Sequence, residues 1–352
     1  MTSLLFSPFA LGGLALKNRI VMAPMCQYRA KDDGCATIWH QVHYGARAVG
    51  GVGLLIVEAT GVTPIGRITG NDLGLWNDAQ GEAMRGIIAF AHTQGAKVGI
   101  QLAHAGRKAA FPHPLAPSPL PFSPDHPVPG EMDVAEIDKV VDSFAEAARR
   151  AVAFGFDLIE IHAAHGYLLH QFISPLSNRR TDSYGGSPEN RARILFRVMT
   201  AVRGRMPATV PLSLRISASD YVEGGLSPAD WVPLLGDLRK NGLDLLHVSS
   251  GGLLPVTPPA VYPGYQLPLA SRLRHPGLAL AAVGILEDYA LAENALNQGL
   301  ADLIALGRGL LRDPYWPIHV ARQAGLADPP AGAGPEIPKP YDQAYRGISP
   351  RP

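Results

Sequence analysis

The chain has 352 residues, and its 31 Lys and Arg residues almost balance its 30 Asp and Glu residues, which gives a formal net charge of +1. A charge so close to zero argues against nucleic acid or an acidic membrane surface as the main partner. Hydrophobic residues make up 47% of the chain and charged residues 17%, a composition that excludes global disorder. The length fits two average domains or one (β/α)8 barrel with insertions.

The two cysteines, Cys26 and Cys35, are too few for a disulfide framework or a four-cysteine zinc site. We therefore expect a reduced, cytoplasmic setting. The N-terminus lacks the basic start and the small-residue cleavage site of a signal peptide. No window approaches about 18 uninterrupted apolar residues, so we expect no membrane span.

Short apolar runs alternate with longer helical patterns along the chain. This alternation predicts a parallel α/β sheet, and eight repeats favour a closed (β/α)8 TIM barrel over an open doubly wound sheet. No GxGxxG fingerprint follows the first predicted strand, which weakens the Rossmann alternative. The predicted strands are 19–25, 53–60, 97–103, 158–164, 211–217, 245–251, 279–284 and 303–308, and the predicted helices are 37–50, 78–95, 133–154, 188–206, 228–242, 266–275, 287–299 and 314–325.

Several segments fall outside this repeat. Residues 9–16 read as a β-hairpin with a Gly-Gly turn, which would plug the N-terminal mouth of the barrel. The proline-rich connections 106–131 and 251–265 follow strand C-termini, so they are candidate lids or pocket walls, with neutral insertions as the alternative. The Pro- and Gly-rich residues 327–352 should have no packed structure of their own. We predict one barrel domain over 1–326 and an extended C-terminal arm over 327–352.

The densest group of reactive side chains is His162, His165 and Tyr167, at the end of the fourth predicted strand. Residues three apart on a strand face opposite sides, so both histidines reach one pocket only if the chain turns out of the strand, which Gly166 permits. Two imidazole donors converging on a carbonyl would stabilise the negative charge that grows there, with Tyr167 as proton donor. The alternatives are histidines with a structural role in a polar loop, and a metal site, which would need a third ligand.

Other residues bear on metal and lysine chemistry. His40 and His43 form a second pair, on a predicted helix with no carboxylate nearby, and we predict no metal site. A Schiff-base lysine is disfavoured because Lys97 opens its strand at the wrong end and Lys108 lies in the loop beyond.

Two further residues on the active face allow two interpretations each. Arg215 lies near the end of the fifth predicted strand, where so deep an arginine must meet an anion, either a ligand or Glu160 on the neighbouring strand. Cys26 follows the first predicted strand and is either an inert apolar side chain or a functional thiol.

Glycines and an arginine close the last two predicted strands. Gly284 ends the seventh, and Gly307 and Arg308 end the eighth. Glycines let backbone N–H groups approach an anion, and the guanidinium adds further donors. The loops after these strands are the usual phosphate site of such barrels, so we predict a phosphate-bearing ligand.

At these residues the sequence resembles the Old Yellow Enzyme family of FMN-dependent ene-reductases. The match runs from Leu16-Lys17-Asn18-Arg19 through Gly307-Arg308, and its most specific segment is HAAHGYLLHQFISPLSNRRTDSYGGSPENR at 162–191. The APMCQY motif at 23–28 and the pair Tyr345-Arg346 are similar to the bacterial "thermophilic-like" branch.

The resemblance implies FMN as cofactor and NADPH or NADH as electron donor. It assigns FMN binding to Ala23, Pro24, Met25, Cys26, Ala59, Gln101, Arg215, Gly284, Gly307 and Arg308, with Arg215 near N1 and C2=O and the last three at the phosphate. It assigns the substrate oxygen to His162 and His165, proton delivery to Tyr167, and the shape of the substrate pocket to Tyr28. In a homodimer or homotetramer, Arg346 with Tyr345 would line a neighbouring subunit's active site.

The implied reaction is the reduction of an activated C=C bond in an α,β-unsaturated carbonyl compound, and by extension of quinones or nitro compounds. Hydride would move from flavin N5 to Cβ, and Tyr167 would protonate Cα. Two alternatives stay open: another FMN-dependent barrel oxidoreductase such as a hydroxy-acid oxidase, and a non-flavin phosphate-binding barrel that is a lyase or has no catalytic role.

Overall fold

The computed structural model describes residues 3–326, 337–341 and 344, and a closed barrel of parallel strands forms its centre. Neighbours along the chain pair side by side, and the last strand closes on the first. The barrel strands are β3 (Ile20–Met22), β4 (Leu54–Gly61), β5 (Lys97–Ala103), β8 (Leu158–Ala163), β9 (Leu212–Ser217), β10 (Leu245–Ser249), β11 (Ala279–Ala282) and β12 (Leu303–Leu306). The predicted (β/α)8 barrel is confirmed.

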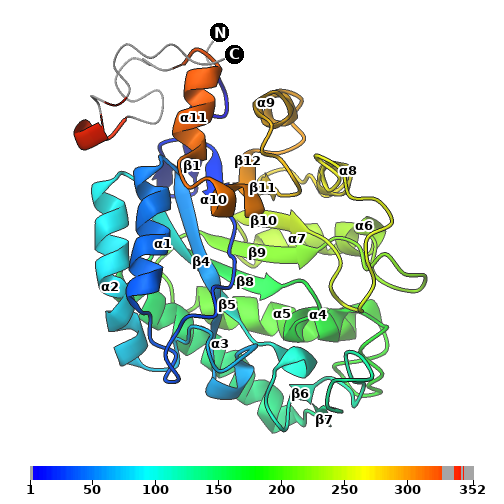
Figure 1. Cartoon of the computed structure of the whole chain (residues 1–352). Helices are drawn as coiled ribbons and strands as arrows, with labels where there is room; N and C mark the ends of the chain where they lie inside the picture. The colour runs from blue at the N-terminus through cyan, green and yellow to red at the C-terminus, as the bar shows by residue number, and fades with distance from the viewer. Residues whose placement is uncertain (1–2, 327–336, 342–343, 345–352) are drawn as a thin grey trace.

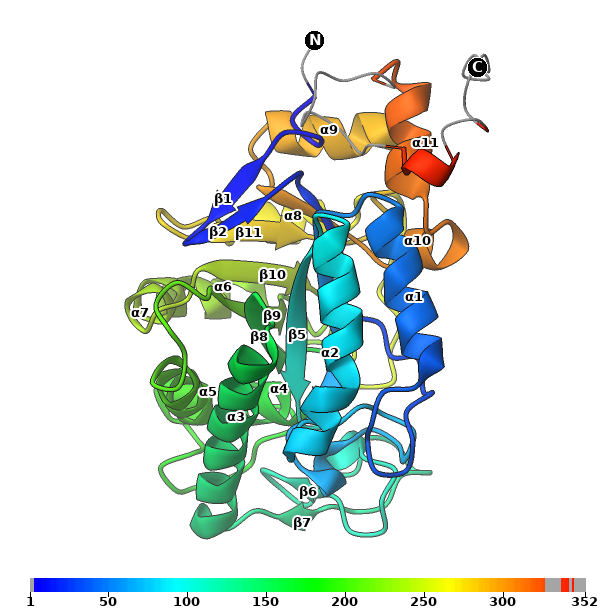
Figure 2. The same cartoon turned by 90° about the vertical axis from the view of Figure 1, so that its left-hand side faces the viewer.

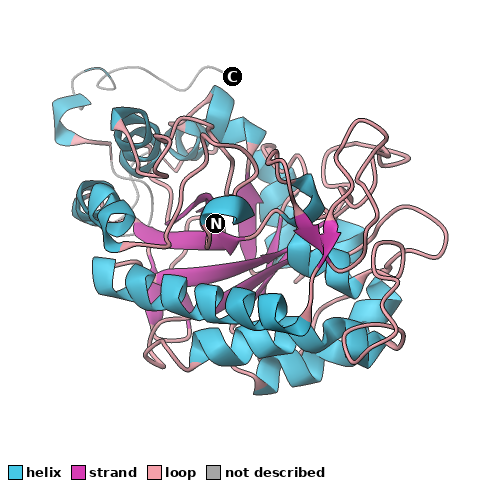
Figure 3. Ribbon diagram, turned by 90° about the horizontal axis from the view of Figure 1, so that it is seen from below, coloured by secondary structure: helices cyan, strands magenta, loops and turns pink. Residues whose placement is uncertain are grey.

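Helices surround the strands and cover the outside of the barrel (Figure 3). The longer ones are α1 (Ile38–Val49), α2 (Asp78–Thr93), α3 (Val134–Phe154), α5 (Pro188–Arg203), α9 (Tyr289–Asn297) and α11 (Trp316–Gln323). In α3, Asp133 caps the first turn by accepting a hydrogen bond from the Glu136 amide, and Gly155 ends the helix at φ 97°. Its apolar side chains recur at helical spacing on one face, which is buried against the barrel.

The N-terminal hairpin closes one end of the barrel. Strands β1 (Phe9–Leu11) and β2 (Leu14–Leu16) pair antiparallel, and Gly12 makes the turn at φ 57°. The hairpin leucines share one apolar cluster with residues that open barrel strands: Leu11, Leu14 and Leu16 pack with Leu54, Leu158, Leu245 and Leu303. The predicted plug is therefore confirmed. Figure 2 shows the hairpin and the pair β6 (Leu115–Ala116) and β7 (Gly130–Glu131) toward opposite ends of the molecule.

Several predicted elements differ from the structure. Strand β11 ends at Ala282, so Gly284 follows the seventh barrel strand and does not end it. The helix predicted over 228–242 is broken into α6 (Pro228–Trp231), the 3-10 turn η3 (Val232–Leu234) and α7 (Leu235–Lys240), because Pro233 has no N–H to continue a helix. The helix predicted over 266–275 is only α8 (Leu267–Ser271). The last barrel strand ends at Leu306, so Arg308 is not a strand residue but begins α10 (Arg308–Arg312).

The connections after the strands carry additional short elements. These are η1 (Pro64–Gly66), η2 (Gly106–Lys108), the β6–β7 pair and α4 (Leu168–Ile173). Helix α4 lies low in the centre of Figure 1, close to α5. All six residues of α4 are buried, so the segment has no amphipathic period from which a helix could be predicted.

Part of the C-terminal arm packs on the barrel. Residues 339–341 form the 3-10 turn η4 (Lys339–Tyr341), and the Tyr341 ring lies 6.2 Å from the Tyr315 ring, centroid to centroid. The expected lack of packed structure is therefore wrong for residues 337–341. The division of the chain at 326 stays a prediction. In the part of the chain that the structure describes, no helix is long and apolar enough to cross a membrane.

Candidate functional site

The two histidines and the tyrosine of the central motif converge on one place. His162 is on β8, and His165 and Gly166 turn the chain out of the strand at φ 57° and 72°. The His162 ring centroid lies 5.2 Å from that of His165 and 4.9 Å from that of Tyr167, both edge to face. The turn that Gly166 was expected to permit is thus made, and it brings all three side chains together.

The local hydrogen bonds determine which nitrogen of His162 carries the proton. His162 Nδ1 accepts a hydrogen bond from the Ala164 amide at 3.2 Å. Burial, together with the positive charge of Arg215, holds the pKa of both His162 and His165 well below 6.5, so both rings are neutral at neutral pH. A neutral His162 then has its proton on Nε2 and can donate it to a ligand oxygen.

His165 is fixed through its side chain and its backbone. Its Nε2 lies 2.8 Å from the Ser249 hydroxyl, and its amide donates to the Ser217 hydroxyl at 2.9 Å. Its carbonyl accepts a hydrogen bond from Lys108 Nζ at 3.0 Å. Ser249 can donate to or accept from the imidazole, and when it donates to Nε2 the proton of a neutral His165 lies on Nδ1.

Lys108 is a site residue that the sequence analysis assigned only to a loop. Its Nζ lies 5.0 Å from the centroid of the Tyr167 ring, at cation–π distance. Burial lowers the pKa of Lys108 to about 8, and burial raises the pKa of Tyr167 above its ordinary value, so the phenol stays protonated. The position of Lys108 soon after β5 was the signal in the sequence that could have identified it as a site residue, because barrel sites are built from the residues that follow strand ends.

Arg215 does not form the ion pair considered for it. Its Nη1 donates to the Pro24 carbonyl at 3.4 Å, and among the described residues its buried Nε has no hydrogen-bond partner. Glu160 instead accepts hydrogen bonds from Gln101 at 2.8 Å and from Ser213 at 2.9 Å, and lies 2.9 Å from His247 Nδ1. A buried guanidinium with an unused donor favours an anionic ligand at this position.

The Gln101 amide is oriented by the same carboxylate. Because Gln101 Nε2 donates to Glu160, the amide oxygen of Gln101 remains as an acceptor. A ligand ring with an N–H group could therefore donate to Gln101 while its oxygens accept from Arg215.

Half of the ten residues predicted to hold the cofactor line one cavity of about 160 Å³. Met25, Arg215, Gly284, Gly307 and Arg308 all line it. The cavity also has lining residues that the sequence analysis did not find, including Ser249, Tyr265 and Gln266. Gln266 lies close to Gly284, where a Cβ would come 3.0 Å from Gln266 Nε2, so glycine keeps the cavity open at that point.

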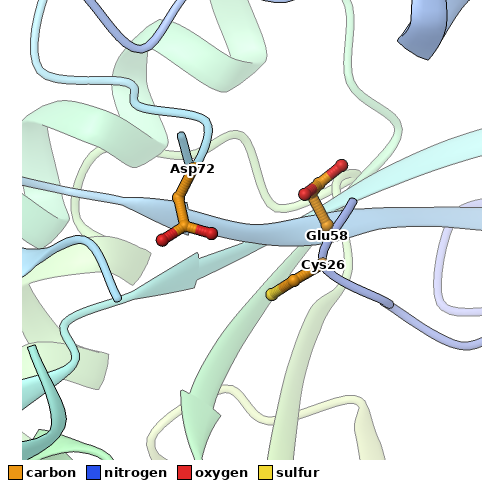
Figure 4. Close-up of side chains that lie close together, drawn as sticks. All are labelled: Cys26, Glu58 and Asp72. Carbon is orange, nitrogen blue, oxygen red and sulfur yellow. The ribbon is translucent and has the colours of Figure 1, made fainter. Parts of the chain in front are cut away.

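The loop after β3 places Cys26 beside two carboxyl groups. Ligand atoms of Cys26, Glu58 and Asp72 all lie within 4.8 Å of one another (Figure 4). Burial is the largest cause that raises the pKa of the Cys26 thiol, and the charges of Glu58 and Asp72 raise it further. Cys26 is therefore a protonated thiol, which does not act as a nucleophile in this state.

Glu58 is already occupied by hydrogen-bond donors. Its Oε2 accepts from the Gln27 amide at 2.6 Å, and its Oε1 accepts from the Tyr44 hydroxyl at 3.2 Å. His40 Nε2 lies 3.4 Å from the same Oε1, so the expectation that no carboxylate is near His40 is wrong. Through these contacts Glu58 holds in place the loop that carries Cys26.

The remaining predicted residues that the structure describes lie around the same loop. The Ala23 amide donates to the Leu306 carbonyl at 3.0 Å, and Ala59 is buried on β4. Tyr28 is 46% exposed and adopts φ 52°, which turns the loop at the edge of the site. Burial raises its pKa to about 12. Arg346 and Tyr345 lie outside the described residues.

The chain is similar to curated and solved proteins over nearly its whole length. It is 49% identical over 349 residues to a NADPH dehydrogenase of Geobacillus thermodenitrificans, an alignment that covers 98% of this chain and 100% of the relative. It is 29% identical to the solved Old Yellow Enzyme homologue from Zymomonas mobilis, with a TM-score of 0.77 over 91% of this chain and 93% of that one.

A larger protein also contains this fold. A solved 2-naphthoyl-CoA reductase is 25% identical, with a TM-score of 0.85 over 92% of this chain, and this chain spans 52% of its length. Residues 4–326 match the NADH:flavin oxidoreductase / NADH oxidase family. The resemblance to Old Yellow Enzyme is thereby confirmed, and the chain belongs to this family of FMN-dependent oxidoreductases.

Proposed function

We propose that the protein uses NADPH to reduce the activated C=C bond of α,β-unsaturated carbonyl compounds. The observation that carries this proposal is the convergence of His162, His165 and Tyr167 at the end of β8, with Arg215 on the neighbouring strand. The relatives named NADPH dehydrogenase support the choice of electron donor.

The residues present fit FMN. The unused Nε of buried Arg215 suits the anionic end of a flavin ring, and the free amide oxygen of Gln101 suits a ring N–H. Gly284, Gly307 and Arg308, which line the same cavity as Arg215, would hold the phosphate. Bound FMN supplies the hydride that an activated double bond accepts at Cβ.

The side chains of this chain have two tasks in that reaction. His162, neutral and with its proton on Nε2, donates a hydrogen bond to the carbonyl oxygen of the substrate, and His165 supplies the second donor. These donors stabilise the negative charge that develops on the oxygen. Tyr167, held in its protonated form by burial, gives its proton to Cα.

A spectroscopic experiment tests the proposal. The purified protein should show oxidised-flavin absorbance, lose it when NADPH is added without oxygen, and regain it when cyclohexenone is added. Bleaching by a hydroxy acid and not by NADPH would support the hydroxy-acid oxidase instead. A protein that binds no flavin would support the phosphate-binding lyase. Quinones and nitro compounds, and NADH beside NADPH, extend the same assay to the substrate range.

We also propose that the arm works in a neighbouring subunit of a homo-oligomer. Residues 337–339 line a groove with Lys17, Gly51 and Gly95, which lie at the N-terminal end of the barrel. The five residues that follow Tyr341, 342–346, span at most about 18 Å. The eight residues of β4, which runs toward the active face, span about 26 Å. Arg346 therefore reaches a neighbour's site more readily than its own.

Mixed oligomers test this role of the arm. A subunit lacking residues 342–352 and a Tyr167→Phe subunit should together give more activity than the sum of the two parents, because one partner supplies the tyrosine and the other the arm. Activity equal to that sum would contradict the shared site.

A cytoplasmic location stays a prediction.

A further inference from the structure

We propose that His170 and Gln171, two adjacent residues of α4, form a clamp on Gly166 that positions His165 and Tyr167. The catalytic effect expected of the clamp rests on the proposed function, in which Tyr167 is the proton donor. His170 and Gln171 are positioning residues, since they act through the backbone of Gly166.

The clamp forms hydrogen bonds with both backbone groups of Gly166, its N–H and its C=O. The Gly166 amide donates to His170 Nδ1 at 2.9 Å, and the Gly166 carbonyl accepts from Gln171 Nε2 at 2.7 Å. Gln171 is itself held, because its Nε2 also donates to the Ala105 carbonyl at 3.1 Å and its Oε1 accepts from the Arg107 amide at 3.1 Å. Both clamp side chains are fully buried.

Asp220 determines the tautomer that the clamp needs. His170 Nε2 lies 2.9 Å from Asp220 Oδ1, and neither side chain is exposed. Burial raises the pKa of Asp220, but the hydrogen bonds around it, from the His170 side chain first and then from the Leu226 amide and the Ser174 hydroxyl, outweigh burial and hold this pKa below its ordinary value. The Ser174 hydroxyl and the Leu226 amide both donate to the other oxygen at 2.8 Å. Because Nδ1 accepts from the Gly166 amide, a neutral His170 has its proton on Nε2, the nitrogen that faces the Asp220 carboxylate.

The clamped glycine follows a residue with an unfavourable backbone conformation. His165 has φ 57° although it is not glycine, and such a conformation persists only when the surrounding contacts determine it. A Cβ at Gly166 would come 2.2 Å from the Gly252 carbonyl oxygen, so no other residue fits there. Because His165 and Tyr167 flank Gly166, any movement of this turn displaces both site side chains.

A pair of substitutions separates the hydrogen bond from simple packing. His170→Leu fills the space but removes the acceptor, whereas His170→Asn keeps an amide oxygen near the place of Nδ1. In protein labelled with ¹⁵N-glycine, the Gly166 amide should exchange faster in the Leu variant, and the Asn variant should largely restore its protection. Equal exchange in wild type and His170→Leu would overturn the clamp.

The catalytic consequence is measured in half-reactions of the FMN-loaded protein. His170→Leu should slow reoxidation by cyclohexenone about 10²-fold, the scale for a displacement of about 1 Å, while bleaching by NADPH is nearly unchanged. Gln171→Glu, which loses the donor to Gly166, should act in the same direction. Both half-reactions falling in proportion would contradict the positioning role and indicate a general structural one.

A matched control comes from a second histidine–carboxylate pair. His92 Nε2 lies 2.7 Å from Asp157 Oδ2, far along the chain from Gly166, so His92→Asn should leave Gly166 exchange and both half-reactions as in wild type. If wild type is bleached by NADPH but not reoxidised by enones, the proposed function fails, and the exchange comparison still decides the clamp.

Discussion

His162 and Tyr167 pack edge to face, with ring centroids 4.9 Å apart and an interplanar angle of 76°. The group proposed to bind the substrate oxygen and the group proposed to give the proton are therefore neighbours on one short segment. Their tasks are nevertheless separable by experiment, because only one of the two transfers a proton.

Replacing Tyr167 with Phe removes the proposed proton donor and keeps the ring that packs on His162. We expect reoxidation by enones to slow by roughly 10²–10⁴, the usual contribution of a positioned acid. Bleaching by NADPH and turnover of quinones, which need no carbon protonation, should be nearly unchanged. Stopped-flow measurement of each half-reaction checks this, and a parallel loss in both would show that Tyr167 binds cofactor or maintains structure.

Replacing His162 with Ala removes a donor whose tautomer is fixed by the Ala164 amide. A hydrogen bond to a charged oxygen contributes about 1.5–3 kcal/mol, so binding of a phenolate, which mimics the enolate, should weaken roughly 10- to 100-fold. Titration followed by flavin absorbance measures this affinity. Zinc and chelators should have no effect, and activity that depends on added metal would contradict the hydrogen-bonding role.

The fold was predictable because apolar strand runs and amphipathic helices recur along the chain, whereas contacts between distant side chains were not. The pairing register is one reason: it places Glu160 opposite Ser213 and Arg215 opposite His162 and His247. Neighbouring strands alone suggested an Arg215–Glu160 pair, and only the folded barrel shows that Glu160 is taken by other donors.

Glu58 and His40 illustrate the same limit within the site. They come from β4 and α1 and meet only when the helix packs on the barrel. The central motif was easier to interpret, because His162, His165 and Tyr167 are close in sequence and a glycine between them permits the turn that joins them. Local geometry is thus predictable where long-range pairing is not.

Replacing Arg215 with Met removes the buried guanidinium whose Nε has no partner among the described residues. We expect weaker FMN binding and a lower flavin potential, because a positive charge stabilises the reduced anion. Each 1.4 kcal/mol of lost stabilisation lowers a two-electron potential by about 30 mV. Arg308→Met is the contrast, since it should weaken binding through the phosphate and leave the potential unchanged. An unchanged potential in Arg215→Met would remove that residue from the role.

Asp72 is a carboxylate that is 1% exposed, and its Oδ1 has no hydrogen-bond partner among the described residues. Burial is the largest cause that raises the pKa of Asp72 from 3.8 to about 6, and the charge of Glu58 adds to it, whereas the hydrogen bond from the Thr69 amide lowers it. Below the unfolded pKa the carboxyl is protonated in both the folded and the unfolded chain. Between about pH 4 and pH 6 the Asp72 carboxyl ionises in the unfolded chain but stays protonated in the folded chain, so the wild type loses stability as pH rises. Above this range the carboxyl is ionised in both states, and the loss of stability is constant.

Asp72→Asn cannot titrate and keeps an oxygen for the Thr69 amide, so it should avoid this loss. At about 1.4 kcal/mol per pKa unit, its free energy of unfolding relative to wild type should increase by up to about 3 kcal/mol between pH 4 and pH 6 and then level off. Urea unfolding of the apoprotein across this range measures the difference. Asp33→Asn is the control: Asp33 accepts a hydrogen bond from the Cys35 amide, which lowers its pKa below 3.8, so its difference from wild type should change only below about pH 4 and stay constant between pH 4 and pH 6. A difference between Asp72→Asn and wild type that does not change with pH would mean that folding leaves the Asp72 carboxylate ionised, with a cation or a donor at its free oxygen.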